Sequence, residues 1–152
     1  MTEKSVATAV AATHTDEQTH TGEHLLREIN RRINSVGDPC SVAHGSPLGL
    51  VDMGMVESVV VGGDGHLRVG MRLTSPSCYM VGYFAEEIRE RLADLPRITQ
   101  VTVEFDNGLD WTPQLMTESG RHKRRQALAA RGIEERVGVG LPLMPVAREA
   151  GA

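Results

Sequence analysis

The sequence has few of the features that mark secreted, membrane-spanning or nucleic-acid-binding proteins. It contains only two cysteines in 152 residues, too few for a disulfide framework, which favours a reducing compartment with both thiols free. Its formal net charge of −4 argues against a nucleic-acid partner, and no apolar run approaches a membrane span. The apolar stretch 6–12 is too short for a secretory signal. We therefore expect a cytoplasmic protein with neither a nucleic-acid nor a membrane partner.

Motifs that would identify a common enzyme class are also absent from the sequence. There is no G-x-x-x-x-G-K-[ST] phosphate loop, no G-x-S-x-G nucleophile elbow and no dinucleotide-binding glycine fingerprint. No C-x-x-C redox pair occurs. Aromatic residues make up only 3% of the chain, so Val, Leu, Ile and Met must fill the core.

The patterns that are present predict one folded domain between two weakly structured ends. Residues 1–21 lack apolar periodicity and are expected to form a disordered tail, and residues 133–152 a loosely attached one. The domain then covers residues 22–132. Its expected elements are a helix from Thr21 to Val36, strands at 55–61 and 66–73, a helix over 81–95, a strand at 98–105 and a helix from Thr112 to about Arg131. Residues 38–54 are expected to form a long loop.

This element order, α-β-β-α-β-α, predicts an α/β fold of the two-layer α+β kind. The glycine-rich stretch 62–65 between the first two strands predicts an antiparallel hairpin. The helix that follows makes a crossover, which should set the second and third strands parallel. Val101, Val103 and Phe105 alternate with polar residues, so the third strand should be buried on one side. The result is a small mixed sheet with helices packed on it.

Cys78 is the first candidate for chemistry because it lies where a strand gives way to a helix. Backbone N–H groups and the helix dipole at such a position favour a thiolate. The dipole contributes about 1 kcal/mol, less than one pKa unit, so a metal or a nearby cation would have to supply the rest. The alternative is a buried cysteine that packs as a small hydrophobe.

Cys40 and His44 form a second candidate, with C-x₃-H spacing in a glycine-rich segment. If that segment folds over Cys78, the three side chains would make a metal-binding set with one open position, which Asp38 or Asp52 could fill. Iron–sulfur clusters usually take four cysteines and this chain has two, so transient binding shared with another chain fits better than a permanent cluster. An ordinary loop cysteine and a solvated histidine remain the alternative.

Three further features have an ordinary and a more specific interpretation. Asp52 either caps backbone N–H groups in the turn before the first strand or contributes to the site. Trp111, the single tryptophan, either packs under the sheet edge or anchors a partner. The basic run 121–125 either faces solvent or docks an acidic partner.

Four segments, in this order, resemble the PaaD/SufT-like metal–sulfur cluster assembly family of small α/β domains. They are Asp38-Pro39 after the first helix, 49–56 (GLVDMGMV) before the hairpin, 73–78 (LTSPSC) before the second helix and 111–113 (WTP) before the third. The resemblance spans roughly Leu25 to Arg125. It implies a factor that matures iron–sulfur or non-haem iron proteins by contact with scaffolds and client apoproteins, and not a catalyst in its own right.

The resemblance also assigns roles to residues. It places the reactive cysteine at Cys78, acidic turn residues of the site at Asp38 and Asp52, and the loop threonine at Thr74. It implies transient iron or iron–sulfur cargo, and for some members an oxygenase client. The sequence departs from the family at Cys40, where a glutamate is usual after Asp-Pro.

Two other functions stay open at this point. One is a thiol enzyme with Cys78 as nucleophile and His44 as base. The other is a metal-free module that stabilises an oxygenase. A homodimer is an open alternative to a monomer for each of the three.

Overall fold

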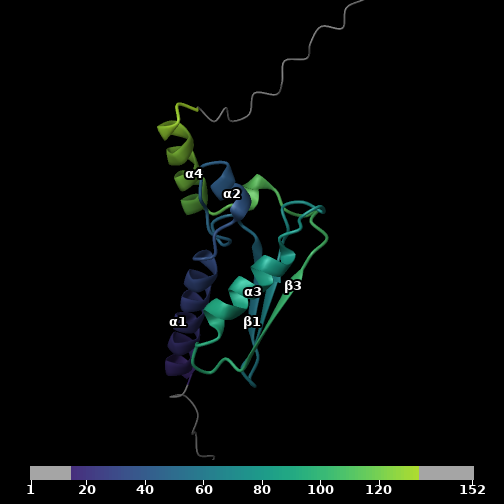
Figure 1. The fold of residues 1–152 in the computed structure, drawn as a ribbon. Helices are drawn as coiled ribbons and strands as arrows, with labels where there is room; N and C mark the ends of the chain where they lie inside the picture. The colour runs from purple at the N-terminus through teal and green to yellow at the C-terminus, as the bar shows by residue number, and fades with distance from the viewer. Residues whose placement is uncertain (1–14, 134–152) are drawn as a thin grey trace, which may run out of the picture.

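The computed structural model describes residues 15–133. Its elements are α1 (Thr15–Asn34), α2 (Pro39–Ala43), β1 (Val56–Val61), β2 (His66–Met71), α3 (Val81–Leu92), β3 (Gln100–Phe105), a short 3-10 helix η1 (Pro113–Leu115) and α4 (Glu118–Ala130). Helices and a small mixed sheet follow one another as the sequence predicts, so the fold class is confirmed (Figure 1). No helix in the described part is long and apolar enough to cross a membrane.

The sheet has three strands in the order β1-β2-β3. β1 and β2 form the predicted antiparallel hairpin, with Val59 opposite Val69. The tight connection needs Gly65, whose φ of 83° lies in the left-handed region. α3 connects β2 to β3, and the two strands run parallel, with Val69 opposite Val103. The predicted crossover and strand directions are therefore confirmed.

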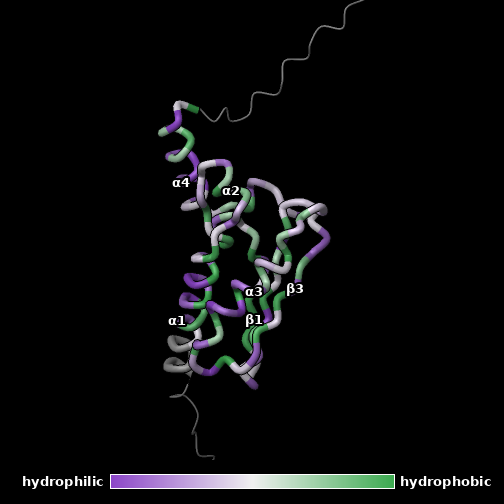
Figure 2. Tube along the Cα trace, in the orientation of Figure 1, coloured by the Kyte–Doolittle hydropathy of each residue, from purple (hydrophilic) through white to green (hydrophobic). Residues whose placement is uncertain are grey.

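The core lies between the sheet and the helices α1 and α3. Side chains without solvent exposure come from all these elements, namely Ile29, Ile33, Val36, Leu50, Leu67, Val69, Ile88 and Leu92. Val103 is buried, and its alternate neighbours Val101 and Phe105 pack against the same cluster. In Figure 2 the strands are mostly green, which marks the apolar character of this layer. One face of β3 is thus buried, as the alternation predicts.

Several predicted boundaries differ from the structure. α1 begins at Thr15, so Thr21 lies inside the helix and does not cap it, and part of the predicted tail is helical. Residues 38–54 are not one long loop, because α2 forms within them. α3 ends at Leu92, before the predicted Leu95. Residues 1–14 and 134–152, which hold the rest of the two predicted tails, lie outside the described residues.

The predicted last helix is interrupted in the structure. Thr112-Pro113 opens only the 3-10 turn η1, after which Met116 adopts an extended conformation with ψ of 141°. The Met116 side chain is buried in the core, with 3% exposure, and the backbone is not helical at this residue. Thr117 then starts α4 by accepting a hydrogen bond from Gly120 N–H. Gly132, with a φ of 71°, follows the end of α4 as predicted.

Candidate functional site

The site begins with α2, a single helical turn built from the segment Asp38–Ala43. Asp38 has extended backbone angles and its Oδ2 accepts a hydrogen bond of 2.7 Å from Ser41 N–H. Pro39 occupies the first turn, where a missing N–H costs nothing. Ser41 Oγ in turn donates to Asp38 O at 2.8 Å. The buried carboxylate of Asp38 therefore caps the N-terminus of α2, which is a structural role.

Cys40 and His44 occupy the two ends of α2. Cys40 is exposed on the first turn, and His44 is the C-cap residue. The His44 ring is held by a contact of 2.6 Å between Nδ1 and the backbone oxygen of Cys40, so Nδ1 carries the proton that is donated. Arg131, just after α4, donates a hydrogen bond to His44 O. The imidazole is thus fixed to the backbone of Cys40, and its other nitrogen is left for a ligand.

A cavity of about 600 Å³ lies between α2, the loop after β2 and α4. Its lining combines residues singled out from the sequence with residues from α4. The lining residues are Asp38, Cys40, Ser41, Ala43, His44, Ser46, Leu48, Met53, Thr74, Trp111, Arg124, Leu128, Arg131 and Ile133. Four of the predicted site residues, Asp38, Cys40, His44 and Thr74, therefore border one hollow.

Cys78 lies in the loop between β2 and α3, next to this cavity but not in its lining. Its N–H donates to Ser75 O at 3.1 Å, which closes a turn, and Met80 is the N-cap of α3. The side chain is half-buried and packs against the hydrophobic core. The following residue, Tyr79, is 89% exposed. Cys78 thus combines a packed side with an opening to the surface.

The two cysteines lie close enough to influence each other. Burial, the Asp38 carboxylate and the Cys78 sulfur, in that order, raise the pKa of the Cys40 thiol. Each of these causes disfavours a negative charge on Cys40. The sequence predicts one shared site only on the condition that the segment around Cys40 folds over Cys78, and this joint site stays a prediction.

The predicted metal-binding set of Cys78, Cys40 and His44 is not assembled as a complete site in one chain. Across residues 15–133, no group of three or more His, Cys, Asp or Glu side chains could hold a metal ion. Within the same part of the chain, no hydrogen bond joins His44 to Cys78. His44 is therefore not arranged as a base for the Cys78 thiol in this conformation.

Asp52 stands apart from the cavity, at the junction of α1, α4 and the turn before β1. Its Oδ2 lies 2.6 Å from Lys123 Nζ and 3.2 Å from Asn34 Nδ2, and its Oδ1 accepts from Thr117 Oγ1 at 3.0 Å. Burial alone would raise the pKa of Asp52, but the hydrogen bonds from these three side chains outweigh it and hold that pKa below its ordinary value of 3.8. The role of Asp52 in these contacts is structural, but its donors are side chains of distant segments and not the backbone N–H groups that the sequence interpretation expected it to cap.

Trp111 and residues of α4 line the same cavity as Cys40. The Trp111 ring is half-buried, lines the cavity and donates from Nε1 to Met53 O at 2.7 Å. Arg124 and Leu128 come from α4 and line the same cavity. Sequence reasoning missed these two residues as part of a site, and the basic run 121–125 was the single signal that pointed toward them.

Comparison with known families decides the class of the chain. A family model described as "Iron-sulfur cluster assembly protein" matches residues 26–105. The chain belongs to this family. The match includes every site residue predicted from the sequence, from Asp38 to Cys78, and it ends before Trp111 and α4.

Individual relatives of the chain agree with the family match. An "Fe-S protein maturation auxiliary factor" of Porphyromonas gingivalis is 28% identical over 91 residues, which are 60% of this chain and 82% of the relative. The "Fe-S protein maturation auxiliary factor YitW" of Bacillus subtilis is 31% identical over 85 residues, 56% of this chain and 76% of the relative.

A solved structure shares the fold. The "Domain of Unknown Function DUF59" from Bacillus anthracis superimposes with a TM-score of 0.59 and 19% sequence identity, covering 76% of this chain and 99% of that one. At this identity the similarity concerns the fold alone.

Proposed function

We propose that this protein is an accessory factor for the maturation of iron–sulfur proteins, and that Cys78, together with Cys40, handles iron or sulfide transiently. Membership of the iron–sulfur cluster assembly family supports the general role, and the relatives are named as maturation factors. In this proposal the protein is an adaptor between an assembly scaffold and a client apoprotein in the cytoplasm, and not a catalyst. A non-haem iron oxygenase component is one such client.

The observation that carries this proposal is a pair of free thiols on separate segments of the chain, with Cys40 in the lining of the cavity and Cys78 half-buried in the loop before α3. Thiolates are the ligands that iron–sulfur clusters prefer, and a cluster usually takes four. One chain offers Cys40 and Cys78, so the remaining ligands have to come from a client, a scaffold or a second copy. A site that needs ligands from a second protein binds iron or sulfide only while that protein is present. Such a site suits transfer of the iron or sulfide better than permanent binding.

Asp38 and Thr74 take supporting positions in the proposed site. Asp38 keeps α2 in place through its N-cap, which fixes the backbone that carries Cys40. Thr74 lines the cavity beside it and offers a hydroxyl for a hydrogen bond to cargo or client. His44 is held by its contact with Cys40 O and lines the same cavity.

Anaerobic reconstitution with ferrous iron and sulfide tests the proposal. Wild type, Cys40→Ser, Cys78→Ser and the neighbouring control Ser77→Ala are compared by visible absorption, and each is then mixed with an apo-ferredoxin as client. Wild type and Ser77→Ala should gain thiolate-to-iron absorption and activate the client. Cys78→Ser should lose both, and Cys40→Ser should retain less iron. A Cys78→Ser protein that loads and delivers iron like the wild type would remove this cysteine from the mechanism.

A metal-free docking module is the second candidate, and the exposure of Tyr79 favours it. An aromatic side chain that is 89% exposed beside Cys78 is suited to burial in a partner. In that case a variant without either thiol would still bind and stabilise the client, and reconstitution would give no absorption. Tyr79→Ala would then weaken client binding while both cysteine substitutions leave it unchanged.

A further inference from the structure

α4 concentrates positive charge, although the chain as a whole is acidic. The helix and the residue that follows it carry Arg121, Lys123, Arg124, Arg125 and Arg131, while Glu118 is the one acidic residue of the helix. The formal net charge of the chain is −4. Figure 2 shows hydrophilic (purple) and hydrophobic (green) residues alternating along α4. The helix lies beyond residues 26–105, so the family match does not account for it.

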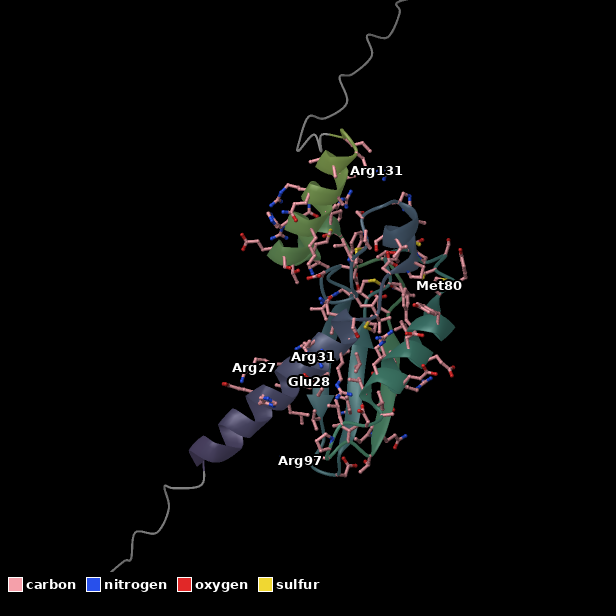
Figure 3. All side chains as sticks on the ribbon, turned by 60° about the vertical axis from the view of Figure 1, so that its left-hand side comes forward. Arg27, Glu28, Arg31, Met80, Arg97 and Arg131 are labelled. Carbon is pink, nitrogen blue, oxygen red and sulfur yellow. The ribbon has the colours of Figure 1, made fainter. Side chains whose placement is uncertain are left out.

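The arginines lie on one face of α4. Arg121, Arg124 and Arg125 are spaced i, i+3 and i+4, and Leu128 and Arg131 continue the same row. From Arg121 to Arg131 the row is about 15 Å long at 1.5 Å per residue. Figure 3 labels Arg131 at the far end of the helix. We call these five residues the arginine stripe.

Two arginines of the stripe are positioned by neutral groups. Arg121 donates to the carbonyl oxygens of Gln114 and Met116, and Arg131 donates to His44 O. Arg125 is exposed and has no carboxylate partner within residues 15–133. Carbonyl oxygens position a guanidinium without neutralising its charge. Like charges at this spacing repel one another, and an anionic ligand would relieve that cost.

A hollow with a mixed polar and apolar lining borders the stripe. Arg124, Leu128 and Arg131 contribute to the lining of the cavity of about 600 Å³, which also includes Trp111 and Met53. The lining of the cavity therefore combines aromatic and aliphatic side chains with guanidinium groups. Carboxylates suit the guanidinium groups, because arginine binds them with two parallel hydrogen bonds, and an apolar side chain suits the aromatic and aliphatic part of the lining.

We propose that the arginine stripe and this cavity bind an acidic segment of a protein partner, with one apolar side chain of that segment in the cavity beside Trp111. This proposal rests on the proposed function, because it takes the acidic segment to belong to a client protein. Docking there would bring the client next to Cys40, which lines the same cavity. An extended nucleic acid suits the site less well, since the stripe is short and the rest of the chain would repel a polyanion.

Fluorescence anisotropy on the full chain tests this proposal. The probe is a fluorescein-labelled, glutamate-rich peptide with one central leucine, and the reference probe has glutamine at each glutamate position. Arg121→Glu combined with Arg125→Glu should weaken binding of the acidic peptide by at least about tenfold, or about 1.4 kcal/mol. Arg68→Glu combined with Arg89→Glu, two exposed arginines on β2 and α3, makes the same change in net charge and should leave the affinity unchanged. Circular dichroism confirms that both double variants are folded.

The single tryptophan reports on the cavity itself. Emission from Trp111 should shift when the leucine-containing peptide binds, and should not shift with a peptide that has serine in place of leucine. Binding of the acidic peptide should also weaken as salt is added. Equal losses in the two double variants, or no binding by the wild type, would overturn the proposal.

Other occupants of the stripe have distinct signatures. A single-stranded RNA oligonucleotide could bind more tightly than the acidic peptide. If the Arg121→Glu, Arg125→Glu variant lost that RNA binding, the stripe would be a nucleic-acid surface and the proposal would be overturned. Self-association in sedimentation velocity that the same variant abolishes would assign the face to a second copy of the chain. Cys78 lies outside the lining of the cavity, so Cys78→Ser should bind the peptide like the wild type. Failure of iron loading with intact peptide binding therefore counts against the proposed function alone.

Discussion

Lys123 Nζ lies 2.6 Å from Asp52 Oδ2 and joins α4 to the turn before β1. The Asp52 side chain is 6% exposed and that of Lys123 is 50% exposed, so a buried carboxylate meets an ammonium group at the surface. Asn34 from α1 and Thr117 at the start of α4 donate to the same carboxylate. Three segments distant in sequence converge on one side chain, which holds α4 at the wall of the cavity.

Replacing Asp52 with asparagine should destabilise the fold. The substitution keeps the size of the side chain but leaves Lys123 and one further donor without a charged acceptor. We expect the free energy of unfolding to fall by about 1–3 kcal/mol at neutral pH, as for a lost hydrogen bond to a charged group. Urea denaturation followed by circular dichroism measures it. Asp110→Asn, an exposed aspartate before η1, is the control and should stay within about 0.5 kcal/mol of wild type.

The stabilisation by Asp52 should depend on pH. Because hydrogen bonds from its partners hold the native pKa of Asp52 below the ordinary value of 3.8, its contribution is fully present above that value. It is lost as the pH falls from there through the lower native pKa. The difference in unfolding free energy between wild type and Asp52→Asn should therefore shrink below about pH 3.8. A difference that grows in this range would show that the native pKa is raised instead.

The sheet could be predicted because its signals are local and periodic. Alternation in Val101, Val103 and Phe105 identifies β3, and the glycine turn identifies the hairpin. The ends of the helices depend on other forces. Residues 15–20 are polar and show no apolar periodicity, so the first turns of α1 leave no trace in the pattern. Burial of Met116 interrupts the last predicted helix, and that burial is a tertiary effect.

Features of the site that depend on one short segment could be predicted from the sequence. Asp38-Pro39 follows the end of α1 as predicted, whereas the role of Asp38 as the N-cap of α2 was missed, because residues 38–54 were expected to form a loop. The approach of Cys40 to Cys78 required the positions of α2 and the loop before α3, which are set by long-range packing. The contribution of Leu128 and Arg131 to the cavity is likewise invisible to sequence periodicity, because it depends on where α4 packs.

Two glycine-to-alanine substitutions in helices should have opposite effects on stability. Gly120 in the first turn of α4 packs so closely on the Asp52 backbone that a Cβ would overlap the Asp52 carbonyl oxygen. Gly120→Ala should cost about 1–3 kcal/mol, because helix and turn must separate. Gly82 on α3 has open space at the Cβ position, so Gly82→Ala should stabilise by up to about 1 kcal/mol through helix propensity. Urea midpoints that move in the same direction would contradict this packing.

The raised pKa of Cys40 should be visible in its rate of alkylation. Burial, the Asp38 carboxylate and the Cys78 sulfur all disfavour the Cys40 thiolate, so less thiolate is present at neutral pH and iodoacetamide should react slowly. Asp38→Asn removes the negative charge and retains a good N-cap residue, so α2 should persist. Its Cys40 should then react faster, with the midpoint of the rate–pH curve at lower pH.

Mass spectrometry of peptides carrying Cys40 and Cys78, sampled over time and pH, gives the two rates separately. Cys78→Ser should move the Cys40 midpoint in the same direction as Asp38→Asn but by less, because the Cys78 sulfur is the smallest of the three causes. The control Asp110→Asn removes an exposed carboxylate elsewhere and should leave the Cys40 midpoint in place. If Cys78→Ser had no effect and Asp38→Asn slowed the reaction, the two thiols would not share one electrostatic environment, and their joint handling of iron would lose its basis.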